Sequence, residues 1–361
     1  MKIIRKKTKE IKVGNVKIGS DNPIIVQSML KNRLENSSSV TSEIKVLQKS
    51  GCEIIRTAVY NHDSIYYLKK LLDEKIFQVP VVADIHFNPL LAIGALDAGV
   101  HCVRINPGNI GGMDRLEKII LKAKEKKAAI RIGVNSGSVD KRILRKNSGN
   151  ILNSITESVT ATVEFFEKLK FYNFKISAKA SSVMDTINAY EAISSKIDYP
   201  LHIGITEAGP LFTGSIKSSL GTGILLSMGI GDTLRVSLTD SSELEVKAAY
   251  VILSNLNLRH RGVNIISCPT CGRTRDDLKS MVGMVEKITS EMSENIKIAV
   301  MGCVVNGPGE AKDADIGIAC GIKKAAIFKN GKVIKRVNVN DVIMEFEKEI
   351  KSYIKKKINH R

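Results

Sequence analysis

Residues 102–134 read CVRINPGNIGGMDRLEKIILKAKEKKAAIRIGV, and this stretch decides the fold class. The runs Cys102–Asn106 and Ala129–Val134 are short, rich in Val and Ile, and typical of buried strands. Between them, Met113–Lys127 repeats apolar residues at helical spacing. Two strands joined by one crossover helix run parallel in one sheet. The stretch therefore predicts a parallel sheet covered by helices.

The same alternation recurs eight times along the chain. Nearly all the predicted strands read as apolar on both faces, as expected for a sheet covered on both sides. They are Pro23–Ser28, Glu53–Ala58, Pro80–Ile85, Cys102–Asn106, Ala129–Val134, Phe174–Ala178, Leu201–Thr206 and Thr233–Leu238. Helices are also predicted at Ser64–Lys75, Asn153–Lys170, Met184–Ile197 and Ser215–Met228. Eight βα units over about 245 residues predict an α/β fold, a (β/α)8 TIM barrel. A doubly wound open sheet is the alternative, but the chain has no Gly-x-Gly-x-x-Gly fingerprint.

The pattern changes near Leu244, and a smaller α/β module is predicted beyond it. We expect residues 1–245 to form the barrel domain, which binds substrate, and residues 246–361 to form the second domain. Helix Leu244–Leu256 opens this module, and Asn330-Gly331 between apolar alternations predicts a hairpin. The remaining predicted elements are strands Val263–Ile266 and Ile296–Val300 and helices Asp277–Met292 and Val342–Lys357.

Composition and charge argue against membrane-spanning, secreted and disulfide-scaffold proteins. The 361 residues include 55 Lys+Arg and 37 Asp+Glu, a net charge of +18, and 43% hydrophobic residues, a globular balance. No run approaches the roughly 18 apolar residues of a membrane helix, and the basic start lacks the apolar segment of a secretory signal. Six Cys are too few for a disulfide scaffold, so a reducing cytoplasm is expected. Binding of nucleic acid is suggested only by charge, much of which lies at the two ends of the chain.

Polar side chains stand at the carboxyl ends of the predicted strands, where the active sites of TIM barrels lie. Four Arg and one Lys are too many unpaired charges for a barrel built only for stability. Asp84 and Glu207 are their only obvious acidic partners, so an anionic ligand is expected there, and Arg suits phosphate. The candidate residues are Arg56, Asp84, His86, Arg104, Arg131, Asn135, Lys179, Thr206, Glu207, Arg235 and Ser237.

A Gly-rich stretch, Thr213–Gly221, follows the seventh predicted strand. TIM barrels often build a phosphate site in this region, at a helix N-terminus. The stretch therefore adds to the expectation of a small phosphorylated or diphosphorylated substrate.

Two Gly/Pro-containing loops of the second module carry cysteines. Cys268, Cys271 and Cys303 provide three soft ligands, suited to zinc or to an iron–sulfur cluster. The sequence offers three candidates for the fourth ligand: His260, Cys320 and Glu310. Of these, Cys320 follows an apolar run that is typical of a core strand. Cys52 and Cys102, near the starts of strands, are expected to be buried packing residues.

Seven motifs closely resemble the hydroxymethylbutenyl diphosphate synthase family, the bacterial iron–sulfur enzymes of the methylerythritol phosphate route to isoprenoids. They are ADIHFNP, VRINPGNIG, RIGVNSGS, HIGITEAG, GIGDTLRVSLT, SCPTCGR and MGCVVNGPGEAKDADIGI. The resemblance runs from about Val13 to Val337. One departure is the run from Asp240 to Glu243 (DSSE), where the family often has an acidic residue and Pro, and it concerns local loop geometry.

The resemblance implies a reductive dehydration that opens 2-C-methylerythritol 2,4-cyclodiphosphate. It implies one [4Fe–4S] cluster per subunit, held by Cys268, Cys271, Cys303 and Glu310, with the basic residues above binding the diphosphate and Glu207 acting as an acid. It also implies a homodimer and electrons from flavodoxin or ferredoxin. A zinc-stabilised lyase or aldolase acting on a phosphorylated substrate is the alternative, and neither nucleic acid nor membrane is an expected partner.

Overall fold

The computed structural model describes residues 3–180, 182–269, 278–290, 292–303, 311–321 and 323–359. The chain forms two compact units, Met1–Arg259 and His260–Arg361. The first unit thus extends beyond residue 245, where the sequence analysis expected the boundary, because residues 245 and 246 both lie inside helix α9 (Ser242–Asn255). This helix buries Val246, Ala249 and Leu253 in the core of the first unit and contacts helix α1 and strand β3. It is therefore the last helix of the barrel.

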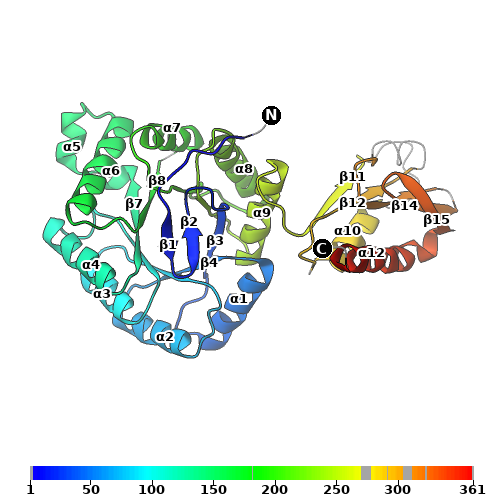
Figure 1. Cartoon of the computed structure of the whole chain (residues 1–361), viewed down its shortest axis with the longest axis horizontal. Coiled ribbons are helices and arrows are strands. Elements are labelled where there is room, and N and C mark those ends of the chain that lie inside the picture. The colour runs from blue at the N-terminus through cyan, green and yellow to red at the C-terminus, as the bar shows by residue number, and fades with distance from the viewer. Residues whose placement is uncertain are drawn as a thin grey trace. The chain divides into compact units, whose positions relative to one another are not determined.

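The first unit is a barrel of eight parallel strands, as the alternation predicts (Figure 1). Their order around the barrel is β8-β7-β6-β5-β4-β3-β10-β9, and a parallel bridge between Ile176 and Leu201 brings β9 back to β8. The strands are β3 (Ile25–Met29), β4 (Ile54–Ala58), β5 (Val81–Asp84), β6 (Cys102–Ile105), β7 (Ala129–Asn135), β8 (Phe174–Lys179), β9 (His202–Ile203) and β10 (Thr233–Leu234).

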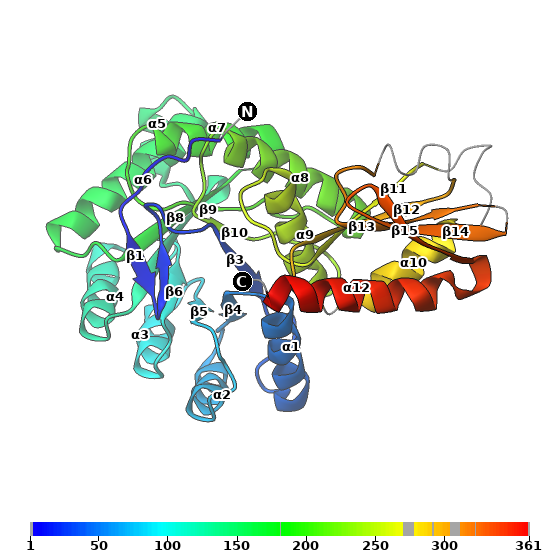
Figure 2. The ribbon, with the colours of Figure 1, turned by 45° about the vertical axis from the view of Figure 1, so that its right-hand side comes forward.

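Each barrel strand is followed by a helix on the outside of the ring, and α1 to α4 stand side by side along one flank (Figure 2). Local signals set where these helices begin: the side chain of Asn61 accepts a hydrogen bond from the Ser64 N–H, and Pro89 follows the capping Asn88. The helices are α1 (Ser37–Ser50), α2 (His62–Asp73), α3 (Pro89–Asp97), α4 (Met113–Glu125), α6 (Ile151–Lys168), α7 (Val183–Ser194), α8 (Leu211–Ser227) and α9, with a short α5 (Lys141–Lys146) before α6.

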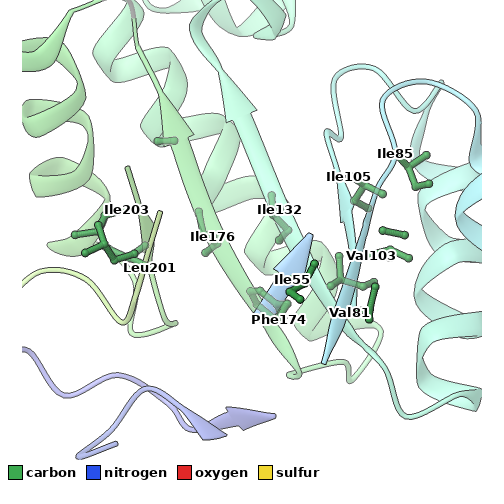
Figure 3. Close-up of a cluster of buried hydrophobic side chains, with 14 of the residues drawn as sticks. Ile55, Val81, Ile85, Val103, Ile105, Ile132, Phe174, Ile176, Leu201 and Ile203 are labelled. Carbon is green, nitrogen blue, oxygen red and sulfur yellow. The ribbon is translucent and has the colours of Figure 1, made fainter. Parts of the chain in front are cut away.

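The two faces of the barrel strands differ in polarity, contrary to the expectation that both are apolar. Residues such as Val103, Ile132 and Ile176 belong to the hydrophobic layer between the strands and the helices (Figure 3). Successive side chains of a strand point to opposite faces, so their neighbours Arg104 and Arg131 point into the barrel. The main apolar core is therefore this outer layer, and the interior above the floor is polar.

A two-stranded hairpin that the periodicity did not predict closes the floor of the barrel. Strands β1 (Ile11–Val13) and β2 (Val16–Ile18) pair antiparallel around Gly14, which has φ +58°. The hairpin packs against inward side chains from the starts of five strands: Ile25, Ile54, Val82, Cys102 and Ala129. Because this end is sealed, the accessible mouth lies at the carboxyl ends of the strands.

In its described residues, the second unit is a five-stranded sheet with two helices, α10 and α12, against it. The strands run in chain order, β11 to β13 parallel and β13 to β15 antiparallel. They are β11 (Val263–Ser267), β12 (Ile296–Met301), β13 (Ile316–Cys320), β14 (Lys324–Lys329) and β15 (Lys332–Asn338), and the helices are α10 (Leu278–Thr289) and α12 (Val342–Asn359). The predicted turn at Asn330-Gly331 is confirmed, with φ of 47° and 74°. Among the described residues of the whole chain, no helix is long and apolar enough to cross a membrane.

Candidate functional site

Arginine side chains from four strands meet inside the barrel. Arg56 on β4, Arg104 on β6 and Arg131 on β7 are 5%, 2% and 1% exposed, and Arg235 directly follows β10. Each occupies an inward position of its strand, so closing the sheet into a barrel brings residues from distant parts of the sequence to one place. The structure thus places these four residues, which the sequence analysis singled out, in the same part of the barrel interior.

Asp84, at the end of β5, is the acid at the centre of this group. Its carboxylate lies 3.3 Å from Arg104 Nη1, 3.7 Å from Arg56 Nε and 3.6 Å from His86 Nε2. Burial alone would raise the pKa of this carboxyl, but Arg56, His86, Arg104 and Arg131 outweigh burial and hold it well below its usual range. Asp84 therefore stays ionised and neutralises one charge of the cluster.

The second acid is Glu245 on α9, which the sequence analysis missed. Its carboxylate is 1% exposed, accepts hydrogen bonds from Ser28 Oγ at 2.8 Å and the Leu238 N–H at 3.0 Å, and lies 3.4 Å from Arg235 Nη2. Glu207, the acidic partner expected from the sequence, is exposed and forms no ion pair among the described residues. It has φ 56°, an uncommon conformation for a residue other than glycine.

Several donors in this cluster have no hydrogen-bond partner in the described part of the chain. They are Nε and Nη2 of Arg104, Nη1 of Arg131 and Nε of Arg235. Arg131 Nε donates to Ser177 Oγ at 3.0 Å, and Arg56 reaches the weakly accepting sulfur of Met29. Burial lowers the pKa of Arg56 to about 10 and the pKa of Arg131 well below its usual value. Buried, unpartnered cationic donors are costly, so the arrangement is suited to an anionic ligand.

A pocket opens beside these arginines. Six residues expected from the sequence line it: Arg56, Arg131, Lys179, Thr206, Arg235 and Ser237. Burial, together with Arg131, Arg104 and Arg56, lowers the pKa of the Lys179 ammonium to about 7. The pocket therefore concentrates positive charge that an anion would stabilise.

The other expected residues lie around the pocket. Asn135 ends β7, and its buried Oδ1 has no partner among the described residues, whereas the side chain of His86 is 57% exposed. Arg104 stacks against Gly133: a Cβ at Gly133 would lie 2.6 Å from Arg104 Nε. A glycine at this position leaves the space that the guanidinium occupies.

Five lining residues were missed by sequence reasoning: Ser177, Ala178, Tyr190, His202 and Gly204. His202 Nδ1 lies 2.7 Å from Thr233 Oγ1, and burial, with Arg131 and Lys175, holds the pKa of its imidazole well below 6.5. His202 is therefore neutral at physiological pH. Strand alternation could have identified two of these residues. Ser177 lies two residues before Lys179, and Gly204 lies two residues before Thr206, so each shares a strand face with an expected site residue.

The Gly-rich stretch Thr213–Gly221 lies within helix α8, beginning at its third residue, and does not form a separate loop. Its glycines allow close packing instead. A Cβ at Gly221 would lie 2.3 Å from Ile205 Cδ1, and one at Gly214 would lie 2.7 Å from the Gly209 carbonyl oxygen. The buried cationic donors without a partner in the described chain belong instead to Arg104, Arg131 and Arg235 in the barrel interior.

In the second unit, Cys268 and Cys303 follow the neighbouring strands β11 and β12 at the same edge of the sheet. The Gly302 N–H donates to Cys268 Sγ at 3.3 Å. Cys271 and Glu310, the other expected ligands, lie outside the described residues. Cys320 is buried, with Sγ 3.4 Å from Met281 Sδ in the core between sheet and helix. In the barrel, Cys52 and Cys102 are buried, as predicted.

Comparison with known proteins gives matches across both units. The GcpE TIM-barrel domain matches residues 8–250, and the GcpE protein C-terminal domain matches residues 264–352. A protein of Caldanaerobacter subterraneus named 4-hydroxy-3-methylbut-2-en-1-yl diphosphate synthase (flavodoxin) is 49% identical over 98% of this chain and 99% of its own length. The protein of the same name from Aquifex aeolicus is 47% identical over 97% of this chain and 98% of its own length.

Among solved structures, the barrel resembles the HPPK-DHPS of Plasmodium falciparum. The TM-score is 0.50 at 12% identity, over 69% of this chain and 52% of that one. This similarity concerns the fold alone. The sequence matches, in contrast, span both units, and the chain therefore belongs to the GcpE family.

Proposed function

We propose that the chain catalyses the reductive opening of 2-C-methylerythritol 2,4-cyclodiphosphate to 4-hydroxy-3-methylbut-2-enyl diphosphate. The cyclic diphosphate, a dianion, takes two electrons and one proton. The carbon–oxygen bond to the ring phosphate and the carbon–hydroxyl bond break, one water leaves, and a double bond forms. The product diphosphate is a trianion, so charge and atoms balance.

One observation carries this proposal: a pocket of buried, partly unpartnered arginines in a chain about half identical to synthases of that name. In the described interior, Arg56, Arg104, Arg131 and Arg235 face only two acidic side chains, those of Asp84 and Glu245. A dianionic ligand would offset the excess positive charge. The same set suits the reaction, because the diphosphate gains a negative charge as the ring opens and preorganised donors stabilise charge that develops.

We assign the remaining pocket residues to binding and orientation of the diphosphate. Lys179 lines the pocket from β8 as a compact cation, and Thr206 and Ser237 contribute hydroxyl groups. Asn135 contributes a buried amide whose Oδ1 has no partner among the described atoms. Asp84 and His86 orient the arginines.

We assign Glu207 the role of the acid that protonates the departing hydroxyl. It directly follows Thr206, which lines the pocket, and its carboxyl is exposed at the mouth. Its left-handed backbone conformation supports a functional role, since such strain collects at active sites. The carboxyl would give its proton to the hydroxyl as water leaves.

We assign Cys268, Cys271, Cys303 and Glu310 as the ligands of one [4Fe–4S] cluster per subunit. The donors that the structure describes fit this group: two thiols at one sheet edge, one already accepting a backbone N–H bond of the kind that tunes cluster sulfur. The bound cluster would supply the electrons, one at a time. Thiol ligands must be reduced to bind iron, which supports a place in the reducing cytoplasm.

We propose flavodoxin as the electron donor, with ferredoxin as the alternative. The matched relatives carry flavodoxin in their names. The net charge of +18 supports an acidic protein as the partner, because opposite charge speeds encounter. Reduction by each purified donor, measured as a function of ionic strength, tests this assignment.

We also propose a homodimer in which the second unit of one copy covers the barrel mouth of the other. An apolar rim supports it: the loops and helix starts after β4, β5 and β9 expose Tyr60, Phe87 and Phe212 by 50%, 69% and 77%. Phe87→Glu with Phe212→Glu should shift the protein toward monomer in light scattering. Tyr172→Glu, at an exposed site before β8 at the other end of the barrel, is the matched control. A monomeric unaltered protein would contradict the proposal.

The function is tested by assaying the anaerobically purified protein with the cyclic diphosphate and reduced flavodoxin. Product formation, about four iron and four sulfide per chain and a brown chromophore are the expected results. Zinc in place of iron, with no product, would favour a lyase or aldolase instead.

A further inference from the structure

One buried ionisable group has no part in the proposed chemistry: Lys175 on β8. Its neighbours Phe174 and Ile176 belong to the outer hydrophobic layer (Figure 3), so strand alternation directs Lys175 into the barrel. The side chain is fully buried, and Nζ has no hydrogen-bond partner in the described part of the chain. An ammonium in that position is costly, whereas a neutral amine is much less so.

The groups around Lys175 are mostly positive. Arg131 on β7 is its direct partner in the strand register, and Arg56 acts on it from β4. Two groups act in the opposite sense: the Cys102 thiol on β6 and Asp232 before β10. The β9 side chain that interacts with Lys175 is the neutral His202.

Asp232 favours the protonated form of Lys175, but its carboxylate also accepts hydrogen bonds from other groups. Its Oδ1 already accepts hydrogen bonds from Arg5 Nη2 and Thr8 Oγ1, both at 3.1 Å, and Oδ2 accepts the Leu201 N–H at 2.9 Å. Burial, aided by Arg131 and Arg56, lowers the pKa of Lys175 to about 8. Lys175 is therefore partly deprotonated in mildly alkaline solution.

We infer that Lys175 is a positioning residue that takes up a proton when an anionic diphosphate binds to the arginines above it. This inference rests on the proposed function. A dianion beside Arg56 and Arg131 cancels the field that disfavours the ammonium, so binding and protonation reinforce each other. The added charge below the pocket then helps to hold a product that is one charge more negative than the substrate.

Calorimetry tests this coupling. The cyclic diphosphate is titrated into the holoenzyme without reductant, in buffers of different ionisation enthalpy, at pH 7 and pH 8. The ligand carries one strongly acidic oxygen on each phosphorus and does not itself titrate in this range. The dependence of the observed heat on buffer enthalpy gives the number of protons taken up.

Lys175→Met should lower the uptake by about half a proton at pH 8 and by only about a tenth at pH 7, as a group with a pKa near 8 requires. Lys175→Arg should lose the same uptake, because arginine stays protonated, and should keep diphosphate affinity closer to that of the unaltered protein. Lys118→Met, at an exposed position on α4, is the control and should change neither quantity.

A second measurement does not depend on the folding of any variant. In the unaltered protein labelled with 13Cε-lysine, one resonance should titrate near pH 8 and move to higher pH when the diphosphate is added. Binding with unchanged proton uptake in both variants, or no resonance that titrates near pH 8, would overturn this inference alone. Absence of diphosphate binding by the unaltered protein would overturn the proposed function together with it.

Discussion

Gly133 is predicted to be essential because Arg104 occupies the space where its side chain would be. A Cβ built at Gly133 lies 2.6 Å from Nε, 2.9 Å from Nη2 and 3.1 Å from Cζ of Arg104. Arg104 is 2% exposed and held by Asp84 at 3.3 Å, so it has little room to retreat. Gly133→Ala therefore displaces the guanidinium from its place beside the pocket without removing its charge.

The expected loss follows from the contact that is displaced. A hydrogen bond to a charged group contributes about 1.5–3 kcal/mol, so diphosphate affinity should fall about 10- to 100-fold. Overpacking adds about 1–3 kcal/mol of destabilisation, visible as a lower melting temperature. Calorimetry with the cyclic diphosphate below that temperature measures the affinity separately from stability.

Two comparisons isolate the mechanism. Gly137→Ala, in the short 3-10 helix Ser136–Ser138 after the same strand, should bind normally, because nothing lies within 4 Å of its added Cβ. Arg104→Ala should leave fold and cluster spectrum intact and weaken binding by the same 10- to 100-fold. The double variant Gly133→Ala/Arg104→Ala should lose no more than Arg104→Ala alone. Normal affinity in Gly133→Ala, or additive losses in the double variant, would refute the reasoning.

Four further outcomes are expected. Glu245→Gln removes the buried carboxylate that pairs with Arg235 and Lys31 and should lower the free energy of unfolding by about 3–5 kcal/mol, measured by denaturant titration. Glu207→Gln should cut turnover while diphosphate affinity holds or rises; the reverse pattern in steady-state kinetics would exclude the acid role. Glu310→Ala should yield an oxygen-sensitive or three-iron cluster without activity, whereas Cys320→Ser should keep cluster and activity; a colourless serine variant beside a brown, active alanine variant would reverse the ligand assignment. Burial lowers the pKa of Lys179 to about 7, and the protonated form binds anions, so affinity should fall as pH rises above 7. Lys179→Arg should move the onset of that fall upward, and a pH-independent affinity of the unaltered protein would contradict it.

The sequence by itself determined the architecture of both units. Strand and helix periods are local properties, so short Val- and Ile-rich runs between amphipathic segments were enough to predict eight βα units. The placement of Arg56, Arg104, Arg131 and Arg235 at strand ends followed from the same local reading. The hairpin β1–β2 was not predicted, because strands of only three residues are too short to show a period.

Local patterns did not reveal which side chains face one another. Glu245 pairs with Arg235 only because α9 packs back against the barrel, and Thr213–Gly221 is helical because its glycines fit closely against neighbouring elements. In the sequence, Lys175 is only one residue of the otherwise largely apolar predicted strand Phe174–Ala178. A strand residue faces either the barrel interior or the surrounding helices only once the sheet has closed. Closure turns alternate residues of all eight strands toward one enclosed space. Tertiary structure therefore decided which charges are buried, which are paired and which are left to bind an anion.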